Sequence, residues 1–233
     1  MKTIGLLGGM SWESTVTYYR LINEGVRDRL GGLHSAKIVL YSVDFHEIEQ
    51  FQHQGKWDEA GVLLAQTAKQ VESAGADFLV ICTNTMHRVA SQIECHIKIP
   101  LLHIADATGE EIKKAGLKTV GLLGTRFTME QDFYRGRLTE RHDLKVVVPH
   151  ERERELVHRV IYEELCLGKI KENSRGQYAT VIQSLLDRGA EGVILGCTEI
   201  SLLVKPEDVR TRLFDTTAIH ACTAVEWATR DSG

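Results

Sequence analysis

Two short segments combine a thiol or hydroxyl with other polar side chains directly after an apolar run. The first is CTNT at residues 82–85, and the second is CTE at residues 197–199. A cysteine thiol can take a proton from carbon and return it, because its pKa of about 8.5 falls readily beside a helix N-terminus. A threonine hydroxyl holds its proton too tightly for that role at neutral pH. Cys197 is therefore the candidate base, whereas the hydroxyl of Thr83 cannot serve as one.

An internal repeat relates these two segments. TIGLLG at residues 3–8 returns as TVGLLG at 119–124, an offset of 116, and GADFLVI at 75–81 returns as GAEGVIL at 189–195, an offset of 114. Two features that recur in the same order at nearly the same spacing predict two similar α/β halves.

The repeat makes Thr83 the counterpart of Cys197, and Asn84 the counterpart of Thr198. Each position lies just past the carboxyl end of an expected buried strand and opens the next helix. Ligands bind at this edge of open α/β sheets, and free backbone N–H groups there suit a carboxylate. A reagent on each side of one carbon is what inversion of configuration needs, since one removes a proton and the other returns one.

Apolar runs of strand length alternate with amphipathic stretches, which indicates α/β architecture with parallel sheets. The expected buried strands lie at residues 3–8, 36–43, 76–82, 99–104, 118–124, 144–148 and 191–196, and helical patterns include residues 57–75 and 158–174. No linker rich in Pro, Gly or Ser separates the halves, so we expect them to pack around a shared cleft. The first domain is expected at 1–114 plus 213–233, the second at 115–212. The last segment should return to the first half as a strand and a helix.

Composition excludes several classes of function. The 233 residues are 43% hydrophobic with a net charge of −4, which argues against nucleic acid or a membrane as the main partner. The start resembles no signal peptide, and no run of about 18 apolar residues occurs. Five cysteines without CxxC spacing indicate a reduced, cytoplasmic protein. No spacing suggests a metal site, and no lysine stands in a recognisable pyridoxal-phosphate context.

Several motifs resemble those of the aspartate/glutamate racemase superfamily over essentially the whole chain. They are GLLGGMSWEST, CTNTMH, GLLGTRFTMEQDFYRGRL, GCTEI and FDTTAIHA. The chain is most similar to the L-aspartate/glutamate-specific, or broad-specificity, amino-acid racemases. The resemblance implies two similar α/β halves, cofactor-independent racemisation by two cysteines, a small amino-acid substrate and a homodimer. Cys197 matches the second cysteine, which acts on the L-enantiomer. The first falls at Thr83 and is missing, with Cys82 one residue early and expected in the core.

The resemblance also suggests the residues that would bind the substrate. The catalytic pair is Thr83 and Cys197, and Glu199 would orient Cys197 or couple to its charge, or serve as a first-turn acid that favours the helix dipole. The α-carboxylate and amino group would meet hydroxyl, amide and backbone groups, and the loop after the first strand would line the same cleft. The residues concerned are Met10, Ser11, Asn84, Thr85, Thr125 and Thr198.

The substrate side chain is less defined. Where aspartate racemases of the family hold the distal carboxylate with a lysine, this chain has Cys166. The family's loop arginine is not obvious, and Gln52, His53 and Gln54 are candidates. A neutral polar substrate such as homoserine stays possible. Two other functions also remain open: a decarboxylase-type lyase, which needs only the second cysteine, and a carboxylate-binding protein descended from a racemase.

Overall fold

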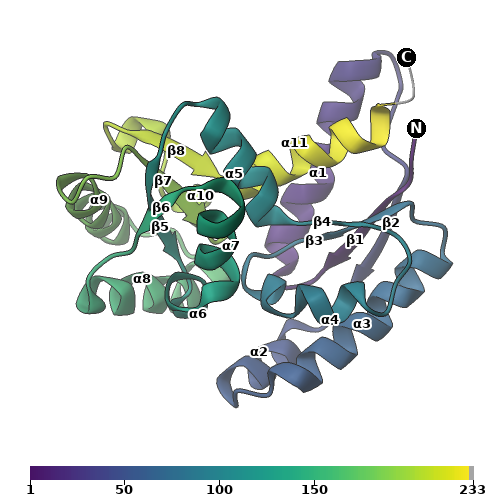
Figure 1. Cartoon of the computed structure of the whole chain (residues 1–233), viewed down its shortest axis with the longest axis horizontal. Coiled ribbons are helices and arrows are strands. Elements are labelled where there is room, and N and C mark those ends of the chain that lie inside the picture. Colours follow the sequence, from purple (N-terminus) through teal and green to yellow (C-terminus); the bar gives the residue numbers. More distant parts are fainter. Residues whose placement is uncertain (231–233) are drawn as a thin grey trace. The chain divides into compact units, whose positions relative to one another are not determined.

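The computed structural model describes residues 1–230, which form two compact units, each built on a four-stranded parallel sheet (Figure 1). Unit 1 comprises Met1–Ile104 and the chain from His220 onward, and unit 2 comprises Ala105–Ile219. The strand order is β2-β1-β3-β4 in unit 1 and β6-β5-β7-β8 in unit 2. The prediction of an α/β fold with two similar parallel-sheet halves is confirmed.

Helices cover both faces of the unit 1 sheet. One face packs on α2, α3 and α4, and the other packs on α1 and α11. Helix α3 follows the expected pattern, because Ala60, Leu64, Ala68 and Val71 recur every three or four residues and are buried together. The elements are β1 (Ile4–Gly8), α1 (Trp12–Leu30), β2 (Ile38–Ser42), α2 (Phe45–His53), α3 (Trp57–Ser73), β3 (Phe78–Ile81), the 3₁₀ helix η1 (Thr85–Val89), α4 (Ala90–Glu94) and β4 (Leu101–Leu102).

Unit 2 has a core in which residues of β5 and β7 pack against α8, α9 and α10. No helix in the described part of the chain combines the length and apolar character needed to cross a bilayer. The elements of unit 2 are α5 (Ile104–Lys114), β5 (Thr119–Gly124), α6 (Arg126–Glu130), α7 (Asp132–His142), β6 (Lys145–Val147), α8 (Glu151–Glu163), the 3₁₀ helix η2 (Leu165–Leu167), α9 (Glu172–Asp187), β7 (Gly192–Gly196), α10 (Ile200–Leu203), the 3₁₀ helix η3 (Pro206–Asp208) and β8 (Arg212–Asp215). The last helix, α11 (Thr216–Thr229), leads from unit 2 into unit 1.

The register of the two sheets matches the sequence repeat. In unit 1 Ile4 pairs with Phe78, and in unit 2 Val120 pairs with Gly192, which are the partners that offsets of 116 and 114 predict. The glycines that precede β3 and β7 both have positive φ, 96° at Gly75 and 92° at Gly189. Such a conformation after a helix favours glycine.

The strand starts also correspond. Asp77 accepts a hydrogen bond from the backbone N–H of Thr3 through Oδ2 (2.6 Å), and Glu191 accepts one from that of Thr119 through Oε2 (2.8 Å). The repeat aligns these acidic residues with each other and these threonines with each other. Thr83 follows Asp77 at the same distance along the chain as Cys197 follows Glu191, so Thr83 and Cys197 are structural equivalents.

Three expectations about the elements were wrong. The strand of the last segment, β8, pairs with β7 of unit 2 rather than with the first half, because Leu213 and Phe214 continue the unit 2 sheet in register with Val193 and Ile194. The helical pattern at residues 158–174 is interrupted, since the chain turns into η2 and then reaches Gly168 at φ 68°. Strand β2 is an edge strand and is not fully buried.

The boundaries between the units also differ from the expected ones. They were expected after residues 114 and 212, and they lie after Ile104 and Ile219. Helix α5 from Ala105 onward and β8 both belong to unit 2, and the chain re-enters unit 1 at His220, within α11. Both elements were expected in the first half. A repeat in the sequence locates equivalent strands, but it does not say to which half a connecting helix packs.

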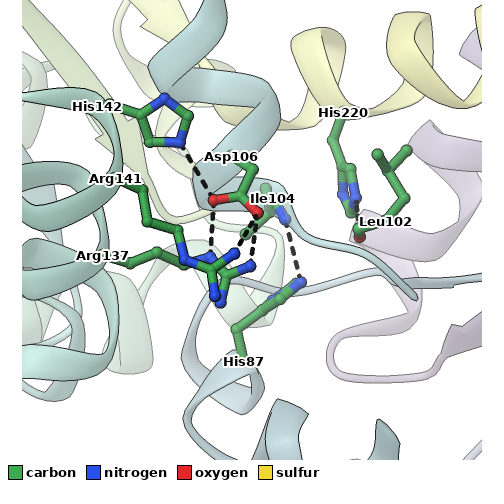
Figure 2. A network of polar contacts seen from close by, with 8 residues as sticks. All are labelled: His87, Leu102, Ile104, Asp106, Arg137, Arg141, His142 and His220. Carbon is green, nitrogen blue, oxygen red and sulfur yellow. Dashed lines mark hydrogen bonds and ion pairs between the residues drawn. The ribbon is translucent and has the colours of Figure 1, made fainter. Parts of the chain in front are cut away.

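A charged cluster fixes the start of α5 to α7 within unit 2. Figure 2 shows Asp106 beside Arg137, Arg141 and His142. Arg137 donates two hydrogen bonds to the carboxylate, at 2.7 and 2.5 Å, and His142 Nε2 lies 3.1 Å from Oδ1. A Cβ atom at Gly109 would lie 2.5 Å from Cγ of His142, so the close approach of α5 and α7 requires glycine there. Partial burial alone would raise the pKa of Asp106, but the bonds from Arg137 and His142 outweigh it and lower that pKa.

We expect Asp106→Asn to lower the free energy of unfolding by about 2 kcal/mol at pH 7, since it weakens two charge-assisted hydrogen bonds. Because the folded pKa of Asp106 lies below its unfolded value of about 3.9, the stabilisation is complete above that pH. It is lost as the pH falls through the lower folded pKa. Urea unfolding at pH 7 and pH 3 should therefore show a difference that shrinks in acid. Asp132→Asn is the control, because its ion pair with Arg135 is exposed, and an equal loss in both variants would contradict the prediction.

Candidate active site

Thr83 lies two residues beyond β3 and is buried, with 8% of its surface exposed. Cys82, the residue before it, is fully buried in the core between the sheet and helices α1 and α11. Its carbonyl oxygen accepts a hydrogen bond from the hydroxyl of Ser14 (3.1 Å), and burial raises the pKa of its thiol well above the usual value. Cys82 is therefore a core residue, as expected, and the residue that follows it occupies the strand end.

Other predicted residues of unit 1 surround this strand end. Asn84 and Thr85 are buried and lead into η1. Gln52 is also buried, and its side-chain N–H donates to Sδ of Met86 at 3.0 Å, which joins α2 to η1 three residues beyond Thr83. His53 and Gln54, the other candidates for the place of the family's arginine, are exposed. Burial and contact therefore favour Gln52 among the three.

Met10 and Ser11 form the loop between β1 and α1, and both are buried. Ser11 is the N-cap of α1, and its hydroxyl accepts a hydrogen bond from the backbone N–H of Ser14 (3.4 Å). Met10 packs in the same core cluster as Met86. The structure thus gives these two residues clear local roles at the end of β1, the strand that pairs with β3.

Cys197, Thr198 and Glu199 form a hydrogen-bonded group at the end of β7. Glu199 Oε2 accepts a hydrogen bond from the thiol of Cys197 (3.0 Å) and a second from the hydroxyl of Thr198 (2.8 Å). All three residues are buried, and Glu199 is only 3% exposed. A carboxylate in contact with a thiol can accept its proton directly, so the arrangement is a thiol paired with a base.

The expected decrease in the pKa of Cys197 was wrong. Burial, followed by the negative charge of Glu199 and the nearby thiol of Cys166, raises this pKa well above its usual value. Helix α10, which begins at Ile200, has only four residues and supplies little dipole to oppose them. Cys197 is therefore a thiol that donates a hydrogen bond to Glu199.

Cys166 and Thr125 complete the predicted set in unit 2. Cys166 lies in η2, half buried, and packs against the core cluster that contains Cys197. Thr125 directly follows β5, whose last residue, Gly124, pairs with Gly196 at the end of β7, so Thr125 and Cys197 leave neighbouring strands at the same level. The Thr125 hydroxyl accepts a hydrogen bond from the backbone N–H of Thr128 (3.3 Å) and caps α6.

Apart from Gln52 on α2 and Cys166 in η2, the predicted residues fall into two groups. One lies at the ends of β1 and β3 in unit 1, and the other lies at the ends of β5 and β7 in unit 2. Within residues 1–230, no group of three or more His, Cys, Asp or Glu side chains is placed to hold a metal ion.

One residue of this region was not identified from the sequence. His87 is 2% exposed, and its Nδ1 lies 2.8 Å from the carbonyl oxygen of Thr83. Its position as the last residue of CTNTMH was the available signal. A histidine that follows a strand end by about one helical turn can place its ring against the carbonyl groups of the preceding residues.

Comparison with known proteins gives consistent matches over nearly the whole chain. The family described as Asp/Glu/Hydantoin racemase matches residues 7–224. A broad-specificity amino-acid racemase, RacX of Bacillus subtilis, is 23% identical over 234 aligned positions, which cover 95% of this chain and 96% of that protein.

Solved structures extend this similarity. A protein from Yersinia pestis described as a candidate Asp/Glu racemase is 59% identical, with a TM-score of 0.91, over 98% of this chain and 99% of that one. An aspartate racemase homologue from Pyrococcus horikoshii is 38% identical, with a TM-score of 0.85, over 98% of this chain and 100% of that one.

Proposed function

The chain belongs to the Asp/Glu/hydantoin racemase family and is an amino-acid racemase, and we propose that it acts on L-aspartate or L-glutamate without a cofactor. The observation that carries this proposal is the bond between the thiol of Cys197 and the carboxylate of Glu199 at a strand end. Cys197 is the base toward the L-enantiomer, and Thr83 stands where a symmetric enzyme would have the second cysteine.

The first step of the proposed reaction moves two protons. Glu199 accepts the thiol proton of Cys197, which leaves a thiolate beside a neutral carboxylic acid and avoids two adjacent negative charges. The thiolate then removes the Cα proton of the substrate, and the C–H electron pair stays on the substrate as a carbanion. Return of a proton from Cys197 regenerates the L-enantiomer, and a proton delivered to the opposite face gives the D-enantiomer.

The remaining residues of the two groups bind the substrate in this proposal. Asn84, Thr85, Thr125 and Thr198 hold the α-carboxylate and amino group, and the loop of Met10 and Ser11 lines the site. Gln52 and Cys166 face the substrate side chain. Because both are uncharged, they hold a distal carboxylate less firmly than lysine or arginine would, and this supports activity on neutral polar amino acids such as homoserine as well.

Two rival functions predict different products. A decarboxylase-type lyase would use Cys197 alone to protonate one face after loss of CO₂, and a carboxylate-binding protein would bind without turnover. Incubation with L-aspartate, L-glutamate and an aryl malonate separates the three. We expect inversion of an amino acid, whereas CO₂ release from the malonate or saturable binding without turnover would contradict the proposal. We also propose, from the family, a cytoplasmic homodimer.

Replacement of Glu199 should move two measurements in opposite directions. Burial and, after it, the negative charge of Glu199 raise the pKa of Cys197. Glu199→Gln removes that charge, so iodoacetamide should alkylate Cys197 faster at pH 7.5, because a lower pKa leaves more of the thiol as thiolate. Exchange of the substrate α-hydrogen should nevertheless fall about 10²-fold, because the proton acceptor is gone.

The exposed Glu207→Gln should change neither rate. Saturating L-glutamate should slow alkylation in the wild type if Cys197 contacts substrate. Slower alkylation in Glu199→Gln than in the wild type would show that Glu199 does not keep the thiol protonated.

A further inference from the structure

His87 holds the backbone of the Thr83 strand end at two consecutive carbonyl groups. Its ring Nδ1 lies 2.8 Å from the carbonyl oxygen of Thr83, and its backbone N–H donates to the carbonyl oxygen of Asn84 at 3.1 Å. The other ring nitrogen, Nε2, accepts a hydrogen bond from the backbone N–H of Ile104 at 3.2 Å (Figure 2). One buried side chain thus joins the strand end to Ile104, the last residue of the first segment of unit 1.

These partners determine the protonation of the ring. A carbonyl oxygen only accepts, so Nδ1 carries the proton, and Nε2 must keep a lone pair to accept from Ile104. Both bonds are made only by the neutral imidazole with its proton on Nδ1. A second proton on Nε2 would point at the N–H of Ile104 and break that bond.

Two histidine rings lie beside the ring of His87. The ring of His103 lies 4.5 Å away between centroids, and that of His220 lies 5.9 Å away. His220 is itself held between the carbonyl oxygen of Leu102 and the hydroxyl of Tyr18, and burial lowers its pKa to about 4. At neutral pH, His220 therefore adds no positive charge beside His87.

The two carbonyl bonds fix the direction of the amides that follow. The peptide bonds after Thr83 and Asn84 are trans, so each carbonyl and the next N–H point in opposite directions. With both carbonyls directed to His87, the N–H groups of Asn84 and Thr85 point away from it. Two adjacent N–H groups with the same direction suit a carboxylate.

We propose that His87 is a positioning residue for the racemase reaction, in which its neutral ring sets the Thr83–Asn84 peptide so that the Asn84 and Thr85 amides receive the substrate α-carboxylate. This inference rests on the proposed function. His87 itself touches no substrate, and it acts through the backbone of the strand end.

Two conservative variants separate the two ring bonds. In His87→Asn, the side-chain NH₂ takes the place of Nδ1 and can still donate to Thr83, while the bond from Ile104 is lost. In His87→Gln, the side-chain oxygen reaches the place of Nε2 and can accept from Ile104, while the bond to Thr83 is lost. Each variant leaves one buried bond unmade, so a purely structural role would affect both alike.

We expect His87→Gln to raise KM for L-glutamate about tenfold, measured as α-hydrogen exchange in D₂O, with kcat changed less than threefold because Cys197 and Glu199 are intact. His87→Asn should keep KM within threefold of the wild type. Equal KM values in the two variants, or a higher KM in His87→Asn, would overturn the proposal.

A second measurement does not depend on activity or on the variants folding. ¹⁵N NMR of the wild-type histidines at pH 7 should show His87 protonated at Nδ1 and not at Nε2. A proton on Nε2 would overturn the inference even if the enzyme racemises glutamate. The wild type could instead show the expected His87 tautomer and yet exchange the α-hydrogen of no amino acid. That result would refute the proposed function, whereas the hydrogen bonds assigned to His87 would stand.

Discussion

Cys197→Ser is expected to reduce turnover of L-glutamate, and exchange of its α-hydrogen with solvent deuterium, by about 10²–10⁴-fold. The serine hydroxyl keeps the hydrogen bond to Glu199 but holds its proton far more tightly than a thiol, so no base of adequate strength faces Cα. Exchange is followed by ¹H NMR in D₂O, which reports proton removal even when no inversion follows.

Cys82→Ser is the matched control, because it makes the same chemical change in the other half of the repeat. Cys82 lies in the core, fully buried, so its replacement should lower stability while leaving most exchange activity. Exchange at the wild-type rate in Cys197→Ser would remove Cys197 from the mechanism. Equal loss in both variants would mean that the alignment of the two strand ends is wrong by one residue.

The second large effect concerns Thr83. Thr83→Cys should raise inversion in both directions by an order of magnitude or more, since a positioned acid or base typically contributes about 10²–10⁴-fold. Without a second acid, the carbanion formed by Cys197 usually recaptures a proton from the same side. A thiol at position 83 supplies the missing proton to the opposite face, and it should bring exchange of D-glutamate close to that of L-glutamate.

Inversion is measured by chiral chromatography, starting from each enantiomer. Thr180→Cys, which adds a thiol at an exposed position of α9, is the control and should change neither rate. A folded Thr83→Cys protein with unchanged inversion would show that Thr83 does not face the substrate, and the lyase or binding-protein function would then be favoured.

The sequence predicted the features that depend on local pattern and repetition. Buried strands such as β3 and β7 are continuous apolar runs, and the glycines at 75 and 189 mark the turns before them. The repeat then predicted the equivalence of Thr83 and Cys197, which the matched sheet registers support. The same pattern also predicted that Cys82 belongs to the core.

Features that depend on packing between distant segments could not be predicted in the same way. Strand β8 has no pattern that distinguishes the unit 2 sheet from the unit 1 sheet, and its pairing with β7 decides its place. The pKa of Cys197 depends on burial and on the orientation of Glu199, which a helix-start pattern does not reveal. The role proposed for His87 likewise depends on the place of its ring between the backbones of Thr83 and Ile104, which no sequence pattern predicts.

The proposed one-sided chemistry is tested most directly by following L-glutamate in D₂O and measuring deuterium at Cα and formation of D-glutamate in the same sample. Two enantiomers have equal free energy in water, so kcat/KM for inversion must match in the two directions, however small both values are. We predict that L-glutamate gains deuterium faster than it inverts, and that D-glutamate exchanges more slowly than L-glutamate. Formation of D-glutamate as fast as deuterium enters L-glutamate would contradict Cys197 as the single effective base, and the absence of any exchange would contradict proton abstraction at Cα.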